Sequence, residues 1–356
     1  MRSRRITARS GLLLALVCLG VLPAVAEAES LSADTALRIV PAVRYGVVRA
    51  EQERGILAPR VRPLLAWYQE QAAPGSIAVV YTPEPRESFP ILMLDERGKT
   101  LSRGTAFRWE DGWLSLVGVP STVRPGAYEL RLPQISVPFQ VTARSFDSET
   151  IPLTAALTAL RTEPDPRKTA EAAELAALLA NADPSAVYET GAFAVPLAKP
   201  RRTAGYGDRR DYRSSDGRSD FSVHNGVDLA LREGAPIAAC GRGRVVMAKE
   251  RLVTGWTVVI EHLPGLYSLY YHMSAICAEV GELVEKGQNI GSMGMTGLAT
   301  GPHLHWEVQV GGVAVDPDRL TTVMPFMPGR WPIPGPAGDP RSATPPTAQP
   351  ATPPAN

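Results

Sequence analysis

The histidines of this chain are confined to one region. All five lie between residues 224 and 305 of the 356-residue sequence. Two of them form the pattern HLH at His303 and His305, and another begins the run HNGVD, from His224 to Asp228. Residues two or four positions apart in an extended strand project to the same face, so each motif presents its polar side chains together. The flanking runs ALREGAPIAA and WEVQV favour strands over helices at these positions.

These residue types are suited to a catalytic zinc ion. Two imidazoles, one carboxylate and an open fourth position form a typical Zn(II) site. Water at the open position has a pKa of about 7, which makes hydroxide available at neutral pH. Two further histidines near that water would transfer protons and stabilise developing charge. The sequence therefore predicts a hydrolytic centre with one zinc ion, in a domain that contains every histidine.

The histidines differ in how strongly their sequence context indicates a functional role. His262 ends an apolar strand before a Leu-Pro-Gly turn, which favours a packed or hydrogen-bonded residue over a functional one. His272 follows two tyrosines, and its spacing alone does not decide between the two interpretations. For the HLH pair, coincidental surface positions are the weaker interpretation, because the pair lies between a glycine-rich turn and an apolar strand.

Short strands and turns are expected to position these residues. The 33 proline and 31 glycine residues argue against a helical bundle, so the fold should be mainly β. Residues 192–324 contain strands separated by many glycines and would form the histidine-bearing β-domain. The preceding region should form a small antiparallel, immunoglobulin-like β-sandwich of roughly 100 residues. Its five strand-like runs are SIAVVYT (76–82), ILMLDE (91–96), WLSLVGV (113–119), AYELRL (127–132) and VPFQVTA (137–143).

A helical connector is expected between these two β-regions, within residues 152–183. Asp165 and Pro166 are a favourable N-cap and first-turn pair. The run RKTAEAAELAALLAN is rich in helix formers and has three leucines at helical spacing, which should pack against a core. The three leucines are Leu175, Leu178 and Leu179.

The first 30 residues have the organisation of a cleavable export signal. A basic start precedes an apolar stretch from Gly11 to Val25, and two small-x-small sites end at Ala26 and Ala28. The apolar stretch is short for a membrane span, although an uncleaved N-terminal anchor is the alternative. A bulky residue precedes Cys18, which argues against lipid attachment there. We expect an exported protein, periplasmic or extracellular, with no stable membrane span after cleavage.

Cleavage after Ala28 would remove four arginines and one glutamate and change the formal charge from +1 to −2. A near-neutral chain gives no electrostatic reason to expect a nucleic-acid partner. Two cysteines would remain, Cys240 and Cys277. In an oxidising compartment they could form a disulfide, or they could be two separate buried thiols. The residues alone leave both alternatives open.

The expected organisation has five parts. The sequence after Trp331 is rich in proline, alanine and threonine, and such a tail cannot bury a core and should be disordered. The parts are a signal peptide (1–28), an accessory β-sandwich (29–150), a helical connector (151–189), a catalytic β-domain (190–325) and a disordered tail (326–356).

Several runs of the histidine-bearing region form a recognisable set: HNGVDLALREGAPIAACGRGRVV, VVIEHLPGLYSLYYHM, VGELVEKGQNIGSMGMTGLATGPHLHWEV and AVDP. Together they resemble the lysostaphin-type (LytM-like) zinc metallopeptidases, most of which are peptidoglycan endopeptidases. The preceding GYGDRR (205–210) fits the loop that enters the site in that family. The resemblance covers about residues 190–320. It implies a compact antiparallel β-fold whose groove presents a metal ion.

The resemblance also implies roles for five residues. His224, Asp228 and His305 would be the zinc ligands. His303 and His272 would be the catalytic pair, which orients and deprotonates the water on the metal and supports the tetrahedral intermediate. The remaining histidine, His262, has no role in the family pattern, which agrees with the structural role that its sequence context favours.

One loop departs from the family pattern. Many members place a tyrosine or asparagine about six residues before the first histidine ligand, whereas this chain has Arg218 there. A substrate-stabilising residue is therefore not assigned at that position, although the nearby Tyr206 and Tyr212 could reach into the site.

The resemblance predicts hydrolysis of amide bonds in peptidoglycan cross-links, with the peptide stems as substrate. Two alternatives remain open. One is a non-enzymatic activator of a separate cell-wall amidase, although members of that kind lose ligand residues that this chain retains. The other is an exported protease that acts on glycine-rich proteins. The N-terminal region would position the enzyme on the wall, bind a wall-associated protein, or cover the groove.

Overall fold

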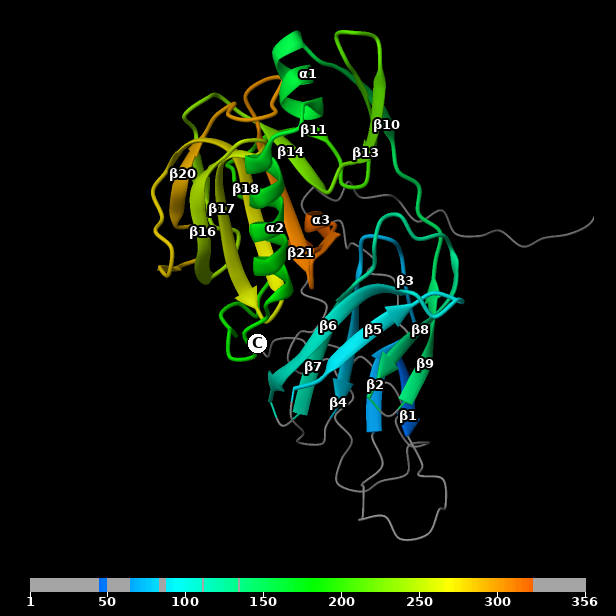
Figure 1. The fold of residues 1–356 in the computed structure, drawn as a ribbon. Coiled ribbons are helices and arrows are strands. Elements are labelled where there is room, and N and C mark those ends of the chain that lie inside the picture. The colour runs from blue at the N-terminus through cyan, green and yellow to red at the C-terminus, as the bar shows by residue number, and fades with distance from the viewer. Residues whose placement is uncertain (1–44, 50–64, 83–87, 111, 134, 323–356) are drawn as a thin grey trace, which may run out of the picture. The chain divides into compact units, whose positions relative to one another are not determined.

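The computed structural model describes residues 45–49, 65–82, 88–110, 112–133 and 135–322 (Figure 1). The predicted signal peptide and the Pro/Ala/Thr-rich tail lie outside these residues. The described residues all belong to one compact unit of the chain. As expected, they are mainly β, with 22 strands and three helices.

The N-terminal β-region consists of nine strands connected in one path, in the order β1-β2-β4-β7-β6-β5-β8-β9-β3. All of its pairs are antiparallel except β3 with β9. The strands are β1 (Tyr45–Arg49), β2 (Leu65–Gln69), β3 (Gln71–Ala72), β4 (Ile77–Thr82), β5 (Pro90–Leu94), β6 (Thr100–Trp109), β7 (Gly112–Gly118), β8 (Gly126–Leu132) and β9 (Ile135–Val141).

The five expected runs correspond to β4, β5, β7, β8 and β9, whereas β6 was not expected. The first half of β6 pairs with β5 and its second half pairs with β7, so this long strand connects the two halves of the path. Val80, Ile91 and Phe139 come from both halves and belong to one buried cluster. The immunoglobulin-like classification of this region stays a prediction.

The connector region begins with β10 (Ser148–Pro152), three residues before the expected bound at residue 151, and continues with α1 (Ala155–Thr162) and α2 (Pro166–Ala180). The expected N-cap is confirmed, because the side chain of Asp165 accepts a hydrogen bond from the backbone N–H of Arg167. The expected packing of the leucine stripe is also confirmed: Leu179 is buried against a cluster of side chains from β16 to β18, and Leu175 and Leu178 pack beside it. Figure 1 shows α2 along this face of the sheet.

The sequence suggested a connector made only of helix, but the structure also has a strand in this region. β10 pairs in parallel with β12, and β12 pairs with β13 in an antiparallel hairpin, which makes a separate three-stranded sheet. β12 spans Arg209–Arg213 and β13 spans Ser219–Val223. The connector is therefore attached to the histidine-bearing region through strand pairing.

Ten strands form the main sheet of the histidine-bearing region, along the path β11-β14-β21-β18-β17-β16-β19 with β15, β20 and β22 beside it. The short helix α3 (Pro317–Thr322) follows. The strands are β11 (Arg201–Ala204), β14 (Gly226–Ala230), β15 (Pro236–Ala238), β16 (Gly243–Arg251), β17 (Gly255–Leu263), β18 (Leu266–Ile276), β19 (Leu283–Val284), β20 (Asn289–Met293), β21 (Leu304–Val310) and β22 (Val313–Val315).

The two central strands β17 and β18 are buried on both faces. Their sequences, GWTVVIEHL and LYSLYYHMSAI, are almost continuously apolar, as expected for strands with no exposed face. One face contributes Val258 and Tyr270 to the largest buried cluster. The other face contributes Val259 and Leu269 to the cluster under α2. This double burial makes the centre of the sheet a rigid support for the side chains at its edge.

The N-terminal β-region also contacts the main sheet. Val79 of β4 and Leu116 of β7 belong to the same buried cluster as Val308 of β21. Arg144 donates to the carboxylate of Asp316 over 2.6 Å. The two β-regions therefore share apolar packing and an ion pair.

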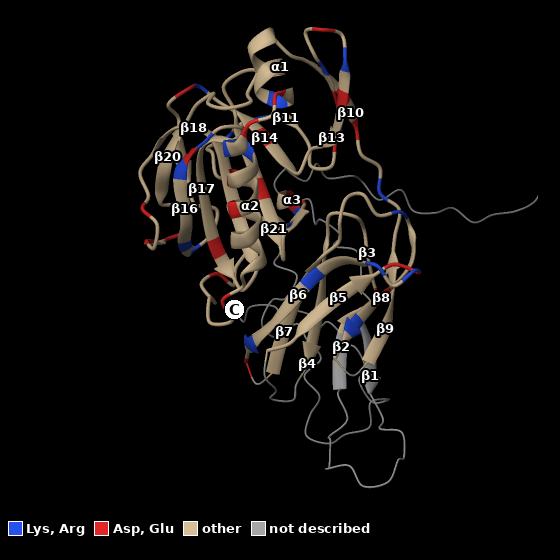
Figure 2. Cartoon of the chain, viewed as in Figure 1, with Lys and Arg blue, Asp and Glu red and all other residues tan. Residues whose placement is uncertain are grey.

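The two cysteines are free thiols in the structure. Cys240 is fully buried and Cys277 is exposed, so the interpretation as two buried thiols is right only for Cys240. Acidic and basic residues are interspersed along the ribbon (Figure 2). Among the described residues, no helix has the length and apolar character needed to cross a bilayer.

Candidate metal centre

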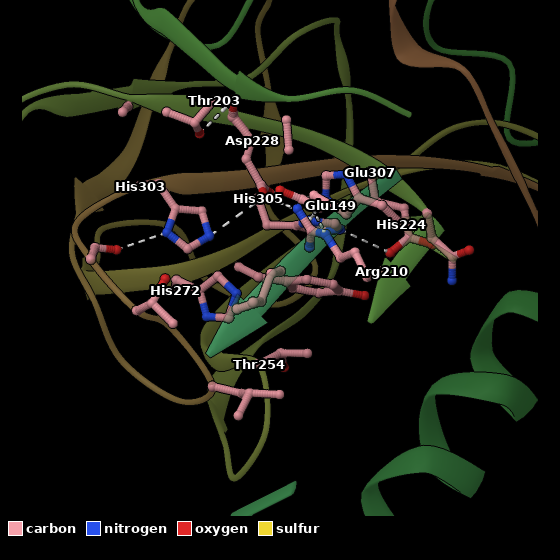
Figure 3. A pocket seen from close by; sticks show the side chains of 18 of the residues that line it. Glu149, Thr203, Arg210, His224, Asp228, Thr254, His272, His303, His305 and Glu307 are labelled. Carbon is pink, nitrogen blue, oxygen red and sulfur yellow. Dashed lines mark hydrogen bonds and ion pairs between the residues drawn. The ribbon is translucent and has the colours of Figure 1, made fainter. Parts of the chain in front are cut away.

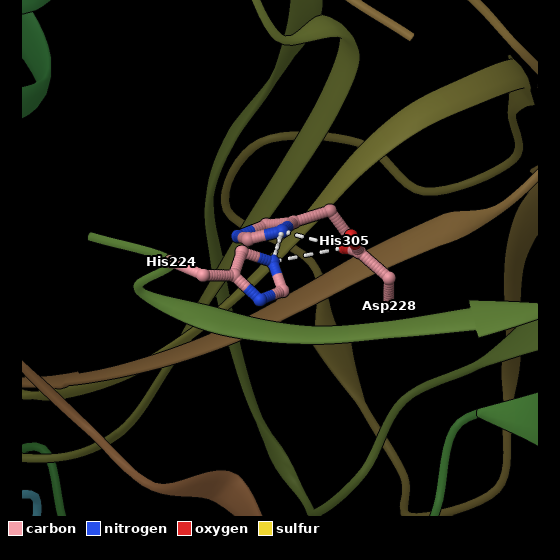
Figure 4. A group of neighbouring side chains, drawn as sticks. All are labelled: His224, Asp228 and His305. Atoms are coloured by element: carbon pink, nitrogen blue, oxygen red, sulfur yellow. Dashed lines mark hydrogen bonds and ion pairs between the residues drawn. The ribbon is translucent and has the colours of Figure 1, made fainter. Parts of the chain in front are cut away.

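Strand pairing brings the two histidine motifs together. β14 and β21 are antiparallel neighbours, and their register places Asp228 directly opposite His305. His224 lies just before β14, and its backbone N–H donates to the carbonyl of Asp208. The side chains of His224, Asp228 and His305 therefore meet beside the paired strands β14 and β21 (Figure 4).

The ligand atoms of these three side chains form a nearly equilateral triangle. Nε2 of His224 lies 3.0 Å from Oδ1 of Asp228 and 2.9 Å from Nδ1 of His305. The third side, from Nδ1 of His305 to Oδ1 of Asp228, is 2.9 Å. Donors bound at 2.0–2.1 Å in a tetrahedral site lie about 3.3 Å from one another. The spacing therefore matches three corners of a tetrahedral metal site.

Polar contacts on the far side of each ring indicate which nitrogen faces the triangle. Nδ1 of His224 lies 2.6 Å from the carbonyl of Gly205 and donates its proton there, so Nε2 turns a lone pair inward. Nε2 of His305 lies 3.6 Å from a carboxylate oxygen of Glu307, and its Nδ1 faces the triangle. Two imidazole nitrogens and a carboxylate oxygen that converge in this way form the donor set of a typical metal site. The donor chemistry fits a divalent metal ion.

Burial and charge act in opposite directions on these groups. Burial lowers the pKa of His224. Burial alone would raise the pKa of Asp228, but hydrogen bonds from His224 and His305 hold it well below its ordinary value. Burial also opposes the charged form of His305, yet its contacts with Asp228 and Glu307 raise its pKa to about 9. A metal ion would take the place of that proton, so metal binding is coupled to proton release.

The two other histidines of the predicted site lie beside the triangle (Figure 3). The ring centroids of His272 and His303 are 4.8 Å apart, and Nε2 of His303 lies 3.8 Å from Oδ1 of Asp228. Nδ1 of His272 donates to the carbonyl of Thr296, and Nδ1 of His303 donates to that of Gly301. In both rings, Nε2 is therefore left with a free lone pair.

His272 has a strained backbone. Its φ of 63° is in the left-handed region, which residues other than glycine rarely adopt, and its N–H donates to the carbonyl of Thr254. Strain of this kind persists where the surrounding structure imposes it, and it is concentrated at functional sites. Burial, followed by the neighbouring His303 and His305, lowers the pKa of His272 to about 3, so its ring is neutral.

A groove with a volume of about 530 Å³ opens over all five residues. Its lining includes Glu149 and Ile151 of β10 and Tyr212 of β12. Val253 and residues 298 and 300–303 also line it. An extended peptide could therefore lie in the groove with one amide bond over the triangle.

The remaining expectations had different outcomes. His262 is fully buried, with Nδ1 donating to the carbonyl of Arg242 and Nε2 beside the hydroxyl of Ser268, so its structural role is confirmed. The suggestion that Tyr206 reaches the site is wrong, because this side chain is buried and its hydroxyl donates to the carbonyl of Ala314. Tyr212 does line the groove.

Two residues at the site were not found by sequence reasoning. Arg210 contacts Asp228, and Glu149 contacts Arg210. Arg210 belongs to the GYGDRR run, but that run indicated only an entrance loop. No pattern in the sequence connects it to a glutamate in the connector.

Comparison with known proteins identifies the same region. Residues 222–317 match the model of peptidase family M23. Over 93 residues the chain is 42% identical to the peptidoglycan DD-endopeptidase ShyB of Vibrio cholerae, a match that covers 26% of this chain and 22% of ShyB. The chain spans only 22% to 32% of the length of the first curated relatives that it matches.

Solved structures give a consistent result. A Pseudomonas aeruginosa structure described as a peptidase M23 is 26% identical with a TM-score of 0.51, covering 70% of this chain and 94% of that one. The catalytic domain of the M23 protein EnpA from Enterococcus faecalis is 35% identical, covering 35% of this chain and 95% of that one, with a TM-score of 0.31. The histidine motifs lie within the part that matches the family model, so residues 222–317 form a peptidase family M23 domain.

Proposed function

We propose that this protein is an exported zinc-dependent endopeptidase that hydrolyses amide bonds in the peptide cross-links of peptidoglycan. The observation that carries the proposal is the convergence of three metal-type donors and two further imidazoles in one groove. A purely structural cluster would not need two further imidazoles that line the groove beside the triangle. Metal-assisted hydrolysis of a peptide bond uses this combination of a metal site and proton-transfer groups.

In this proposal His224, Asp228 and His305 hold the ion. The donor set of two imidazoles and one carboxylate suits zinc, with one position open. A zinc ion in this place supplies Lewis acidity and lowers the pKa of water to about 7. The carbonyl of Gly205 and the carboxylate of Glu307 keep the two imidazole rings in the ligating tautomers.

His303 is the better placed of the two imidazoles for proton transfer. Its ring is partly exposed to the groove, and the Gly301 carbonyl fixes its Nδ1–H, so Nε2 accepts the proton of the attacking water. The same nitrogen then donates that proton to the leaving amine. His272 is buried and neutral, and its Nε2 orients the reacting groups.

Peptide stems of the cell wall are the proposed substrate. Relatives such as ShyB are named peptidoglycan DD-endopeptidases, and the groove has room for an extended peptide. This substrate implies a location in the cell envelope, as does the signal-like sequence of residues 1–28. In the same proposal, residues 29–150 form an accessory domain that positions residues 190–325 on the wall or on a wall-associated protein.

Metal analysis combined with muropeptide digestion tests the proposal. We expect His305→Ala to lose both zinc and activity, because only two donors remain. His303→Ala should retain about one zinc per chain and lose roughly 10²- to 10⁴-fold in rate, the usual contribution of general acid–base catalysis. Mass spectrometry of the released muropeptides then identifies the bond that is cleaved.

Other outcomes would point elsewhere. A zinc-free protein that is fully active would refute the metal mechanism. Wild-type protein that leaves muropeptides intact but stimulates a cell-wall amidase would support the activator alternative. Cleavage of a glycine-rich peptide in preference to cross-linked muropeptides would support the exported protease.

A further inference from the structure

The metal-ligating carboxylate is held from behind by an arginine. Oδ1 of Asp228 faces the two imidazole nitrogens, whereas Oδ2 lies 2.6 Å from Nη2 of Arg210 on β12. The two side chains are only 8% and 11% exposed. The two oxygens of one carboxylate therefore have separate partners (Figure 3).

The arginine is itself held by a second carboxylate. Nε of Arg210 donates to Oε1 of Glu149 over 2.5 Å. The parallel pairing of β10 with β12 places Glu149 opposite Arg210 in the register. A guanidinium fork between two carboxylates has little freedom to rotate, because each bond is charge-assisted and fixed in direction.

The charge balance favours this arrangement. Burial alone would make a guanidinium easier to deprotonate, but the charge of Asp228 raises the pKa of Arg210 further above its ordinary range. Removal of one member would leave a buried charge without its partner. The two linked ion pairs, Glu149 with Arg210 and Arg210 with Asp228, therefore depend on each other.

We propose that Arg210, supported by Glu149, is a positioning residue that restricts Asp228 to a single metal-ligating oxygen. The inference rests on the proposed metal site and concerns its coordination number. With Oδ2 bonded to the guanidinium, Asp228 offers only Oδ1, so the protein supplies three donors and a fourth position is left for solvent. Without Arg210, Oδ2 is free to turn toward the ion, and the carboxylate becomes bidentate.

Cobalt(II) in the full-length protein reports this difference directly, because four-coordinate Co(II) absorbs visible light strongly and five- or six-coordinate Co(II) absorbs weakly. We expect wild-type protein to bind Co(II) with the intense spectrum. Arg210→Met should lose most of that intensity and bind Co(II) about 10- to 100-fold more weakly, the usual cost of losing such a partner of a ligand. Glu149→Gln retains a hydrogen-bond acceptor but removes a charge. It should also lower the intensity of the Co(II) spectrum and the affinity for Co(II), but by less than Arg210→Met.

Arg218→Met is the matched control. Arg218 follows β12 in the same hairpin, is 74% exposed at its side chain and pairs only with Asp216, so its loss should change neither readout. Arg210→Lys separates charge from geometry, because a lysine cannot bridge both carboxylates. We expect it to resemble the methionine variant more than the wild type.

An unchanged spectrum and affinity in Arg210→Met would overturn the inference. If circular dichroism shows that this variant is unfolded, Glu149→Gln decides the question alone, and wild-type values in it would equally overturn the inference. Failure of the proposed function has a different signature. It appears as wild-type protein that binds no Co(II), or that binds it with the intense spectrum and cleaves no muropeptide.

Discussion

At the scale of single residues, a shared device fixes the histidine tautomers. Four of the five rings donate Nδ1–H to a backbone carbonyl, which leaves Nε2 to act as an acceptor. His305 is the exception, since its Nδ1 faces the triangle and its Nε2 faces Glu307. A carbonyl is part of the rigid backbone, so each ring is oriented without a second side chain. The four rings are those of His224, His262, His272 and His303.

The buried His262 makes stability dependent on pH. Burial lowers its pKa to about 4 in the folded protein, against about 6.5 in an unfolded chain. The stabilisation is therefore complete above pH 6.5 and is lost as the pH falls toward 4, by up to about 3 kcal/mol. Urea unfolding at several pH values, for wild type and His262→Gln in the presence of chelator, measures this. The variant should be less stable at pH 7.5, and the difference between the two proteins should shrink on acidification. A difference in unfolding free energy that does not change with pH would contradict the lowered pKa of His262.

At the scale of elements, the pairing of β14 with β21 does more than bring ligands together. Gly226 of β14 lies so close to β21 that an added Cβ would meet the carbonyl oxygen of Trp306 at 2.4 Å and Nε2 of His305 at 2.9 Å. The glycine of the HNGVD run is therefore required by the close approach of the His305 ring, a proposed metal ligand.

Gly226→Ala should push His305 out of position. We expect a loss of about 1–3 kcal/mol in stability from the clash with backbone, and weaker metal binding because one donor moves. Isothermal titration with Zn²⁺ and thermal unfolding measure the two effects. Gly301→Ala is the control, because an added Cβ there meets nothing within 4 Å. Equal zinc affinities in the two variants would count against this interpretation.

Local patterns predicted the parts of the fold that depend on local physics. The continuous apolar run of β4, the alternating run of β8, the Asp165 cap and the clustering of histidines are all short-range signals. β6 was missed because Arg103 and Gly104 interrupt its apolar alternation, although pairing with two neighbours stabilises it. The register that sets Asp228 opposite His305 and the approach of Glu149 to Arg210 depend on pairing between distant segments. Periodicity carries no information about such pairing.

At the scale of the whole molecule, a bound ion would cross-link separate segments. Two of the three proposed ligands lie on β14 and β21, and the third, His224, lies two residues before β14 begins. The unfolded chain does not hold these donors together, so the ion binds only the folded state.

Chelation should therefore destabilise the full-length protein. At a free zinc concentration of about 100 times Kd, binding contributes about 2.7 kcal/mol, which corresponds to a shift of several degrees in Tm. Differential scanning calorimetry with and without EDTA measures the shift. His305→Ala should show no dependence on EDTA, and a dependence equal to that of the wild type would rule out the triangle as the site of the stabilising ion.

The parallel pair of β10 and β12 bears on where a shortened fragment of this chain should begin. The family match starts at residue 222, whereas the arginine behind the aspartate and the glutamate behind that arginine both precede it. A recombinant fragment cut to the matched span, or begun near residue 190, would retain every proposed ligand but lack Glu149. The affinity of this fragment for the ion would then be lower than that of the intact chain, for a reason unrelated to substrate access. Low activity in such a fragment would be easy to misattribute to the loss of a targeting domain.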